Sequence, residues 1–117
     1  MQDLVDTQGA KRYTTGPLPL AQAKTRADRL EAILANHQRD GGADMTVREL
    51  CEAFNAMGYR DRSGRPLVLF PNHCEAGMAS LEAAERVQCD RENKRACRVT
   101  GVHVKVYRLV AKQVELI

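Results

Sequence analysis

The most regular alternation of apolar and polar positions lies between residues 46 and 58. Apolar residues recur there at the spacing of a single helix face: Leu50, Ala53, Phe54 and Met57. Thr46 and Glu49 form a capping box at its start, in which each side chain accepts the backbone N–H of the other residue. Gly58 can adopt the left-handed conformation that ends a helix. The pattern therefore predicts a helix over this segment, with its apolar face turned towards a core.

A second amphipathic pattern precedes it. A helix is predicted from Pro19 or Leu20 to about Gln38, because one face carries Leu30, Ile33, Leu34 and His37 at helical spacing. Charged side chains, Glu31 among them, occupy the other faces. A short extended piece at residues 43–45 then leads into the helix described above, and we expect it to pair with strands that follow later in the chain.

A third helix is predicted over residues 72–86. Asn72 is its expected N-cap, and Glu75 three residues later completes a second capping box. Met78 and Leu81 lie on its inward side. Its outer side is made mainly of alanine and glutamate, with Ser80 between them.

The last third of the chain has the period of two that is typical of strands. Val87–Asp90 and Ala96–Val99 flank a turn centred on Asn93, a pairing that would place Cys89 opposite Cys97. Gly101 breaks the alternation, as a bulge or a second turn would. Beyond it, one face of the strand is expected to hold Val102, Val104 and Val106, and the other His103, Lys105 and Tyr107.

Three helices followed by a basic hairpin predict an α+β fold, and this order resembles the winged helix-turn-helix superfamily over about residues 25–110. The resemblance implies that the wing, Arg91–Arg95, touches phosphates or the minor groove. It also implies that helix 72–86, as the recognition helix in the major groove, and the loop 60–65 lie nearby. The expected organisation is a flexible arm at residues 1–18, a winged-helix domain at residues 19–112 and a short tail at residues 113–117.

The segment between the second and third helices is rich in arginine and glycine. Arg60, Arg62 and Arg65 surround Ser63-Gly64, and Pro66 disfavours helix at the preceding residue. The apolar run 68–70 that follows is expected to be buried. Residues 46–67 resemble a local motif in the DNA-binding regions of large serine recombinases, in which a helix ends at glycine and a basic loop leads to the next helix.

Charge is distributed unevenly along the chain. The net charge is only +3, yet residues 86–112 hold eight basic and two acidic side chains, and the remainder is slightly acidic. A basic third on an acidic body is typical of a phosphate-binding face, although a solvated hairpin would have the same composition. Aromatic residues are too few for stacking on single-stranded bases.

These features lead to a hypothesis: a small duplex-DNA-binding regulator of bacterial or mobile-element origin, acting as a dimer. Phosphate contacts are expected from the arginines and lysine of the hairpin and loop, and base contacts from three residues of the third helix. The candidate DNA-binding residues are Arg60, Arg62, Arg65, Asn72, His73, Ser80, Arg86, Arg91, Lys94, Arg95 and Arg98.

The glutamates of helix 72–86 oppose this hypothesis, because carboxylates facing DNA are repulsive. They favour the alternative of a protein-interaction module, an adaptor or inhibitor, that uses the acidic and small face of that helix. No nucleophile motif, phosphate loop or zinc-knuckle spacing is present, so neither an enzyme nor a cofactor or metal is expected. Without a membrane span or signal peptide, the expected location is the cytoplasm, where the four cysteines would be reduced.

Overall fold

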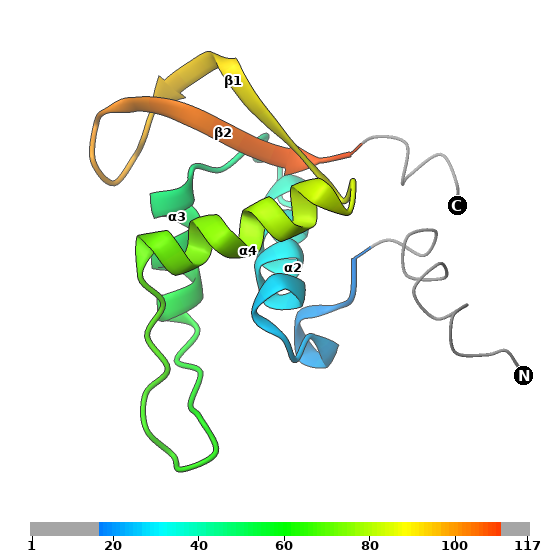
Figure 1. Cartoon of the computed structure of the whole chain (residues 1–117), viewed down its shortest axis with the longest axis vertical. Coiled ribbons are helices and arrows are strands. Elements are labelled where there is room, and N and C mark those ends of the chain that lie inside the picture. The colour runs from blue at the N-terminus through cyan, green and yellow to red at the C-terminus, as the bar shows by residue number, and fades with distance from the viewer. Residues whose placement is uncertain (1–16, 111–117) are drawn as a thin grey trace, which may run out of the picture.

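A computed structural model describes residues 17–110 of the chain (Figure 1). It is an α+β arrangement of three α-helices followed by a two-stranded antiparallel sheet, which confirms the predicted order. The elements are η1 (Leu20–Gln22), α2 (Arg26–Arg39), α3 (Val47–Ala56), α4 (Pro71–Ala83), β1 (Val87–Ala96) and β2 (His103–Leu109). The expected arm and tail lie almost entirely outside the described residues.

Helix α2 begins six residues later than the sequence pattern indicates. Leu20–Gln22 form a separate 3-10 turn, and the chain is extended again at Ala23. Thr25 then caps α2, because its hydroxyl accepts the backbone N–H of Asp28 at 3.1 Å. Alanines at helical spacing carry no information about where a helix starts, whereas a threonine with an acidic residue three positions on does.

The capping box of α3 is confirmed, with Thr46 and Glu49 exchanging both hydrogen bonds. The extended piece before it is also confirmed. Met45 forms an isolated antiparallel bridge with Tyr107, with backbone N–H to carbonyl distances of 3.0 and 2.8 Å. Strand β2 therefore has a backbone partner on each side, β1 along one edge and Met45 on the other.

The predicted cap of α4 is wrong. Phe70 is the N-cap and Pro71 the first helical residue, and among the described residues no side chain caps this end. Proline fits the first position because its φ is already helical and it lacks an N–H that would need an acceptor. The helix ends at Ala83, and Glu85 beyond it has a positive φ of 61°.

The predicted turn of the hairpin is wrong too. Strand β1 continues to Ala96, and the turn lies at residues 97–102, with Gly101 at a φ of 78°. Cys89 pairs with Tyr107 rather than with Cys97. The carboxylate of Asp90 accepts the N–H groups of Glu92 and Asn93, which creates a bulge between Asp90 and Arg95 instead of a chain reversal.

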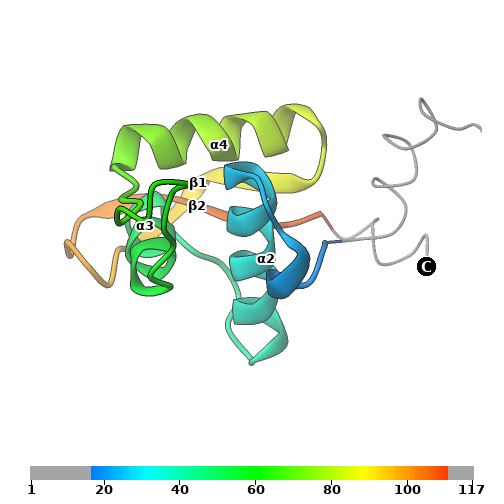
Figure 2. The same ribbon diagram turned by 90° about the horizontal axis from the view of Figure 1, so that it is seen from below.

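The core lies where the three helices meet beneath the hairpin (Figures 1 and 2). Its fully buried side chains include Leu30, Leu34, Leu50, Phe54, Met78 and Tyr107. Tyr107 was expected on the solvent side of β2, but it is 1% exposed, as is Val106. The apolar run 68–70 was expected to be buried, yet only Leu69 is.

Candidate nucleic-acid interface

A groove of about 580 Å³ separates the first turns of α3 and α4 from the hairpin. Its apolar lining is Val47, Pro71 and Val104. Its remaining lining residues are the cations Arg48, Arg91, Lys94 and Lys105, together with His103 and the carboxylate Glu75. A groove with four cationic side chains and one carboxylate attracts an anionic ligand.

Two of these cations already have partners on α4. Lys105 Nζ lies 2.6 Å from Glu75 Oε2, and Arg91 donates to both carboxylate oxygens of Glu82 at 3.0 and 3.2 Å. The hydrogen bond from Arg91 lowers the pKa of Glu82. By contrast, Arg48 and Lys94 are exposed and have no acidic partner among residues 17–110. These two side chains are available to a ligand.

The same ion pairs change the character of α4. Of the three glutamates that opposed DNA binding, Glu75 and Glu82 form ion pairs with the hairpin, and Glu85 is exposed beyond the end of α4. The exposed residues between and around them are small or uncharged: Asn72, His73, Ala76, Ala79, Ser80 and Ala83. Figure 2 shows α4 as a layer of its own, outside α2 and α3, so this face is open along its length.

Arg86, an expected phosphate contact, is directed into the protein. Its guanidinium lies 2.8 Å from the carboxylate of Glu31 on α2, and the side chains are 5% and 1% exposed. The pair joins the end of α4 to the middle of α2. Burial of both partners makes this a structural contact that a ligand does not reach.

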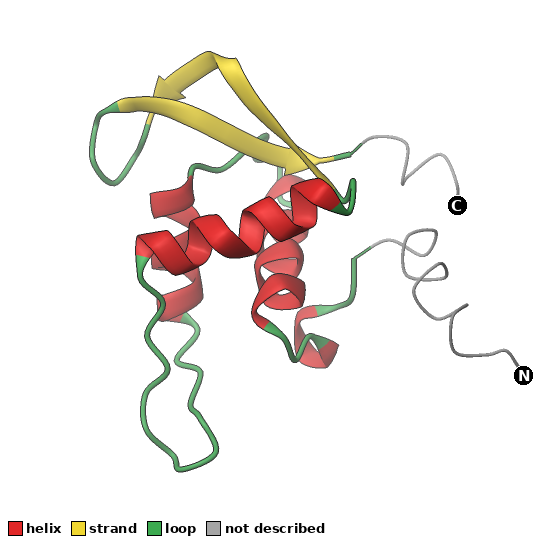
Figure 3. Ribbon diagram, viewed as in Figure 1, coloured by secondary structure: helices red, strands yellow, loops and turns green. Residues whose placement is uncertain are grey.

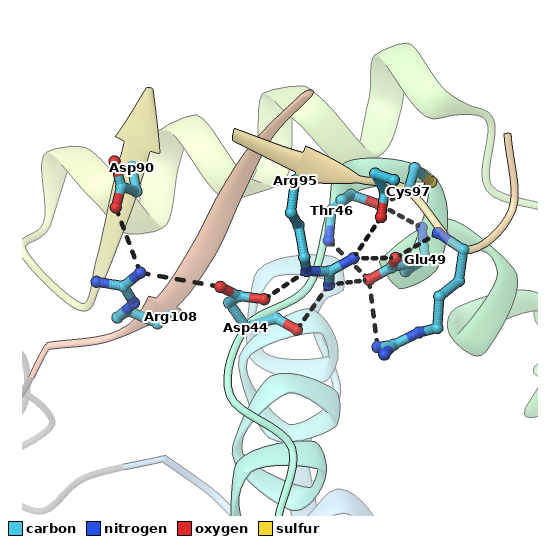
Figure 4. Close-up of polar contacts among 9 residues, drawn as sticks. Asp44, Thr46, Glu49, Asp90, Arg95, Cys97 and Arg108 are labelled. Carbon is cyan, nitrogen blue, oxygen red and sulfur yellow. Dashed lines mark hydrogen bonds and ion pairs between the residues drawn. The ribbon is translucent and has the colours of Figure 1, made fainter. Parts of the chain in front are cut away.

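Arg95 is likewise a structural residue (Figure 4). Its guanidinium donates to both oxygens of Glu49, at 2.6 and 2.7 Å, and to Asp44 Oδ1 at 2.8 Å. Glu49 also accepts the backbone N–H groups of Thr46 and Arg98. Burial alone would raise the pKa of Glu49, but the hydrogen bonds from Arg95, Arg98 and Thr46 outweigh it and lower the pKa to about 2.

The hairpin turn lies just beyond this cluster. Cys97 Sγ is buried 3.1 Å from Thr46 Oγ1, which anchors the base of the turn on the cap of α3. Burial raises the pKa of the Cys97 thiol, but hydrogen bonds from Thr46, Thr100 and Val99 lower it by more. The Arg98 side chain remains 62% exposed, 3.5 Å from Glu49. Of the expected wing contacts, Lys94, Arg98 and Arg91 are therefore at the surface, with Arg91 paired to Glu82.

The segment between α3 and α4 forms a projecting finger, residues 60–66 (Figure 3). Arg60 and Pro66 are bridged across its base, and Gly64 at its tip has a φ of 87°. Arg62 and Arg65 are exposed, as expected. Below the base, the Asn55 side chain holds Leu69 by two hydrogen bonds, at 2.8 and 3.0 Å.

The structure brings only some of the predicted residues together. Lys94 and Arg91 line the groove, whereas Asn72, His73 and Ser80 lie on the open face of α4. Sequence reasoning missed three groove residues: Arg48, His103 and Lys105. Gly101 was the available signal, because a turn placed there brings residues 103–105 back alongside residues 91–96.

Comparison with known proteins adds no relative: no protein family, curated protein or solved structure matches this chain. None of the described helices is long and apolar enough to cross a membrane. Within residues 17–110, no three His, Cys, Asp or Glu residues are grouped so as to hold a metal ion.

Proposed function

We propose that this chain is a small winged-helix protein that binds duplex DNA and acts in transcription regulation. The observation that carries the proposal is the cationic groove beside α4, whose exposed residues are mostly small or uncharged and whose Glu75 and Glu82 are ion-paired. Arg48 and Lys94 are unpaired within the described residues, and they border α4 on the side of the hairpin. The bridge between Met45 and Tyr107 supports the winged-helix assignment, since it adds a short strand to the hairpin.

In this proposal α4 enters the major groove and a phosphate backbone lies in the cationic groove. The major groove is about 12 Å wide and accepts a single helix. Asn72, His73 and Ser80 would face base edges, where the alanines between them allow close approach. Most of the affinity would come from phosphate contacts, so binding is expected to be strongly salt-dependent and only weakly selective for sequence.

The test is fluorescence-anisotropy titration of a random duplex across a salt series. Each phosphate contact contributes about 0.9 to the slope of log affinity against log salt. The double variant Arg48→Ala/Lys94→Ala should therefore bind more weakly and flatten the slope by about 2. Arg39→Ala is the control, because Arg39 is exposed at the end of α2 that lies away from α4 (Figure 2). A wild-type chain that does not bind at low salt would exclude the proposal.

A protein-interaction module is the second candidate, now favoured by a different feature. Two of the three glutamates expected to form its acidic face are ion-paired with the hairpin. Leu67, Val68 and Phe70, however, are 37%, 54% and 57% exposed between the finger and α4. Replacing Leu67 and Val68 with serine separates the two functions, since Phe70 is the N-cap of α4 and its ring contacts His73. A DNA-binding protein should keep its affinity for DNA, whereas an apolar interface with a partner protein would be lost.

A further inference from the structure

We infer that the finger, residues 60–66, is a second DNA-contacting arm, placed across α4 from the hairpin turn. One molecule would then contact the backbones on both sides of a major groove. This inference rests on the proposed function and extends it. A recognition helix with a single wing would contact the phosphate backbone on only one side of the major groove.

The finger is a hairpin held by hydrogen bonds among its own residues. The Asp61 carboxylate accepts from Ser63 Oγ at 2.6 Å, Ser63 N at 2.9 Å and Arg65 N at 3.0 Å. The hydrogen bonds from Ser63 and Arg65 lower the pKa of Asp61, so the carboxylate is ionised at neutral pH. Arg60 Nη1 closes the structure from the other side by donating to Gly64 O at 2.8 Å. Ordering the finger in advance lowers the entropy lost on binding.

The tip of the finger carries two arginines that form no ion pair within residues 17–110. Arg62 and Arg65 are exposed and lack an acidic partner there, in contrast to Arg86, Arg91 and Arg95, which are all paired. Two unpaired arginines held at the end of a rigid projection suit phosphate oxygens or a minor-groove edge.

The arrangement of the elements matches this use. In Figure 1 the finger extends downwards from the N-terminal end of α4, and the hairpin turn lies above the same end. In Figure 2, α4 forms the upper layer, and the finger and the hairpin turn both lie below it, on the side of α3. A helix that stands forward between two recessed basic arms is complementary to a major groove between its two phosphate ridges.

The first experiment removes the finger's charge. Arg62→Ala/Arg65→Ala should weaken binding to a random duplex of about 20 base pairs and flatten the salt slope by about 2, as two lost phosphate contacts require. Arg39→Ala is the control for removal of charge away from the interface. An unchanged slope in the finger variant, with Arg48→Ala/Lys94→Ala still flattening it, would overturn the second arm and leave the proposed function standing. Absence of binding by the wild type would overturn both.

A second experiment tests geometry independently of charge. Asp61→Ala makes the protein more positive by one, so bulk electrostatics alone would strengthen DNA binding. If the finger acts as an ordered arm, the same change should weaken binding about 2- to 10-fold, because three hydrogen bonds that fix the tip are lost. Asp61→Asn retains an acceptor oxygen and should lose less. Tighter binding by Asp61→Ala than by the wild type would overturn the inference.

Discussion

At the scale of single residues, buried carboxylates decide what the basic side chains of this protein do. Glu31 forms an ion pair with Arg86, and Glu49 and Asp44 form ion pairs with Arg95. These two arginines therefore stabilise the fold and are not available to a ligand. Glu49 is the most connected of these groups, since it also caps α3 and accepts the N–H of Arg98. Its ionised form therefore contributes to the attachment of the hairpin to the helices, alongside the buried Tyr107.

This gives the stability of the protein a defined pH dependence. The pKa of Glu49 is lowered from 4.5 to about 2 in the folded state. A lowered pKa stabilises the folded state above pH 4.5, and this contribution is lost as the pH falls through 4 towards 2. The loss should amount to about 2 kcal/mol, allowing for solvent screening. Urea unfolding followed by circular dichroism at pH 7, 5, 4 and 3 measures it.

Glu49→Gln should be destabilised at pH 7 by about 1–3 kcal/mol, because Arg95 loses one of its two charged partners and keeps only Asp44. Between pH 5 and 3 its stability should change less than that of the wild type. Glu52→Gln is the matched control, because Glu52 is exposed on the same helix. Parallel pH profiles for the wild type and Glu49→Gln would show that another group is responsible.

Local chemistry made some residues predictable and left others hidden. The capping box of Thr46 and Glu49 was predictable because both partners lie within one turn. Asn72 has equally good capping chemistry, but the N-cap is Phe70, two residues earlier, because Pro71 takes the first helical position. Arg86 could not be predicted as buried, since its partner Glu31 is 55 residues away and looks like a solvated helix residue in sequence.

At the scale of the elements, α4 is fixed by close packing on α2. A Cβ atom added to Gly77 would lie 2.9 Å from Leu30 Cδ1, and Leu30 is fully buried. Glycine in a helix interior ordinarily costs about 1 kcal/mol relative to alanine. Here that cost is offset by the close approach of the two helices.

A larger residue at this position should separate the helices. Gly77→Val is expected to lower the free energy of unfolding by about 2 kcal/mol, because overpacking displaces Leu30 and its neighbours. Ala79→Val is the control, since Ala79 lies on the open face of the same helix and should change stability by only a few tenths. Thermal or urea unfolding distinguishes the two. Equal effects of both variants would mean that α2 and α4 can repack freely.

Element order was read correctly from the sequence, whereas the register of the hairpin was not. Each of the three α-helices shows apolar residues at helical spacing in the sequence, so three helices could be predicted. The hairpin turn was misplaced because Arg91–Arg95 has the polar composition of a turn, although Asp90 folds it into a bulge. The groove could not be predicted either, because the residues that line it are brought together by the register of the hairpin.

At the scale of the whole molecule, opposite charges join the hairpin to the helical body. The acidic body and basic hairpin expected from the sequence are present, but many of their charges face each other. The outward charge is consequently smaller than composition suggests, and it is concentrated on the groove, the hairpin turn and the finger. A charge map drawn from the sequence alone could not separate these two populations.

This balance can be shifted by one substitution. Glu75→Gln should release Lys105 into the groove and remove a negative charge beside it, so DNA affinity should rise several-fold with a steeper salt slope. The free energy of unfolding should change by less than about 1 kcal/mol, since the ion pair between Glu75 and Lys105 is at the surface. Glu52→Gln serves as the control for charge alone. Weaker binding by Glu75→Gln would mean that its carboxylate itself contacts the ligand.

The bridge between Arg60 and Pro66 has a consequence for how such a protein can diversify. The two stems of the finger return to the same point, and Asn55 secures the chain below it. Residues can therefore be inserted or removed at the tip without altering the distance between α3 and α4. If the finger contacts DNA as proposed, its length would determine how far along a duplex the protein reaches, while α3 and α4 keep their positions.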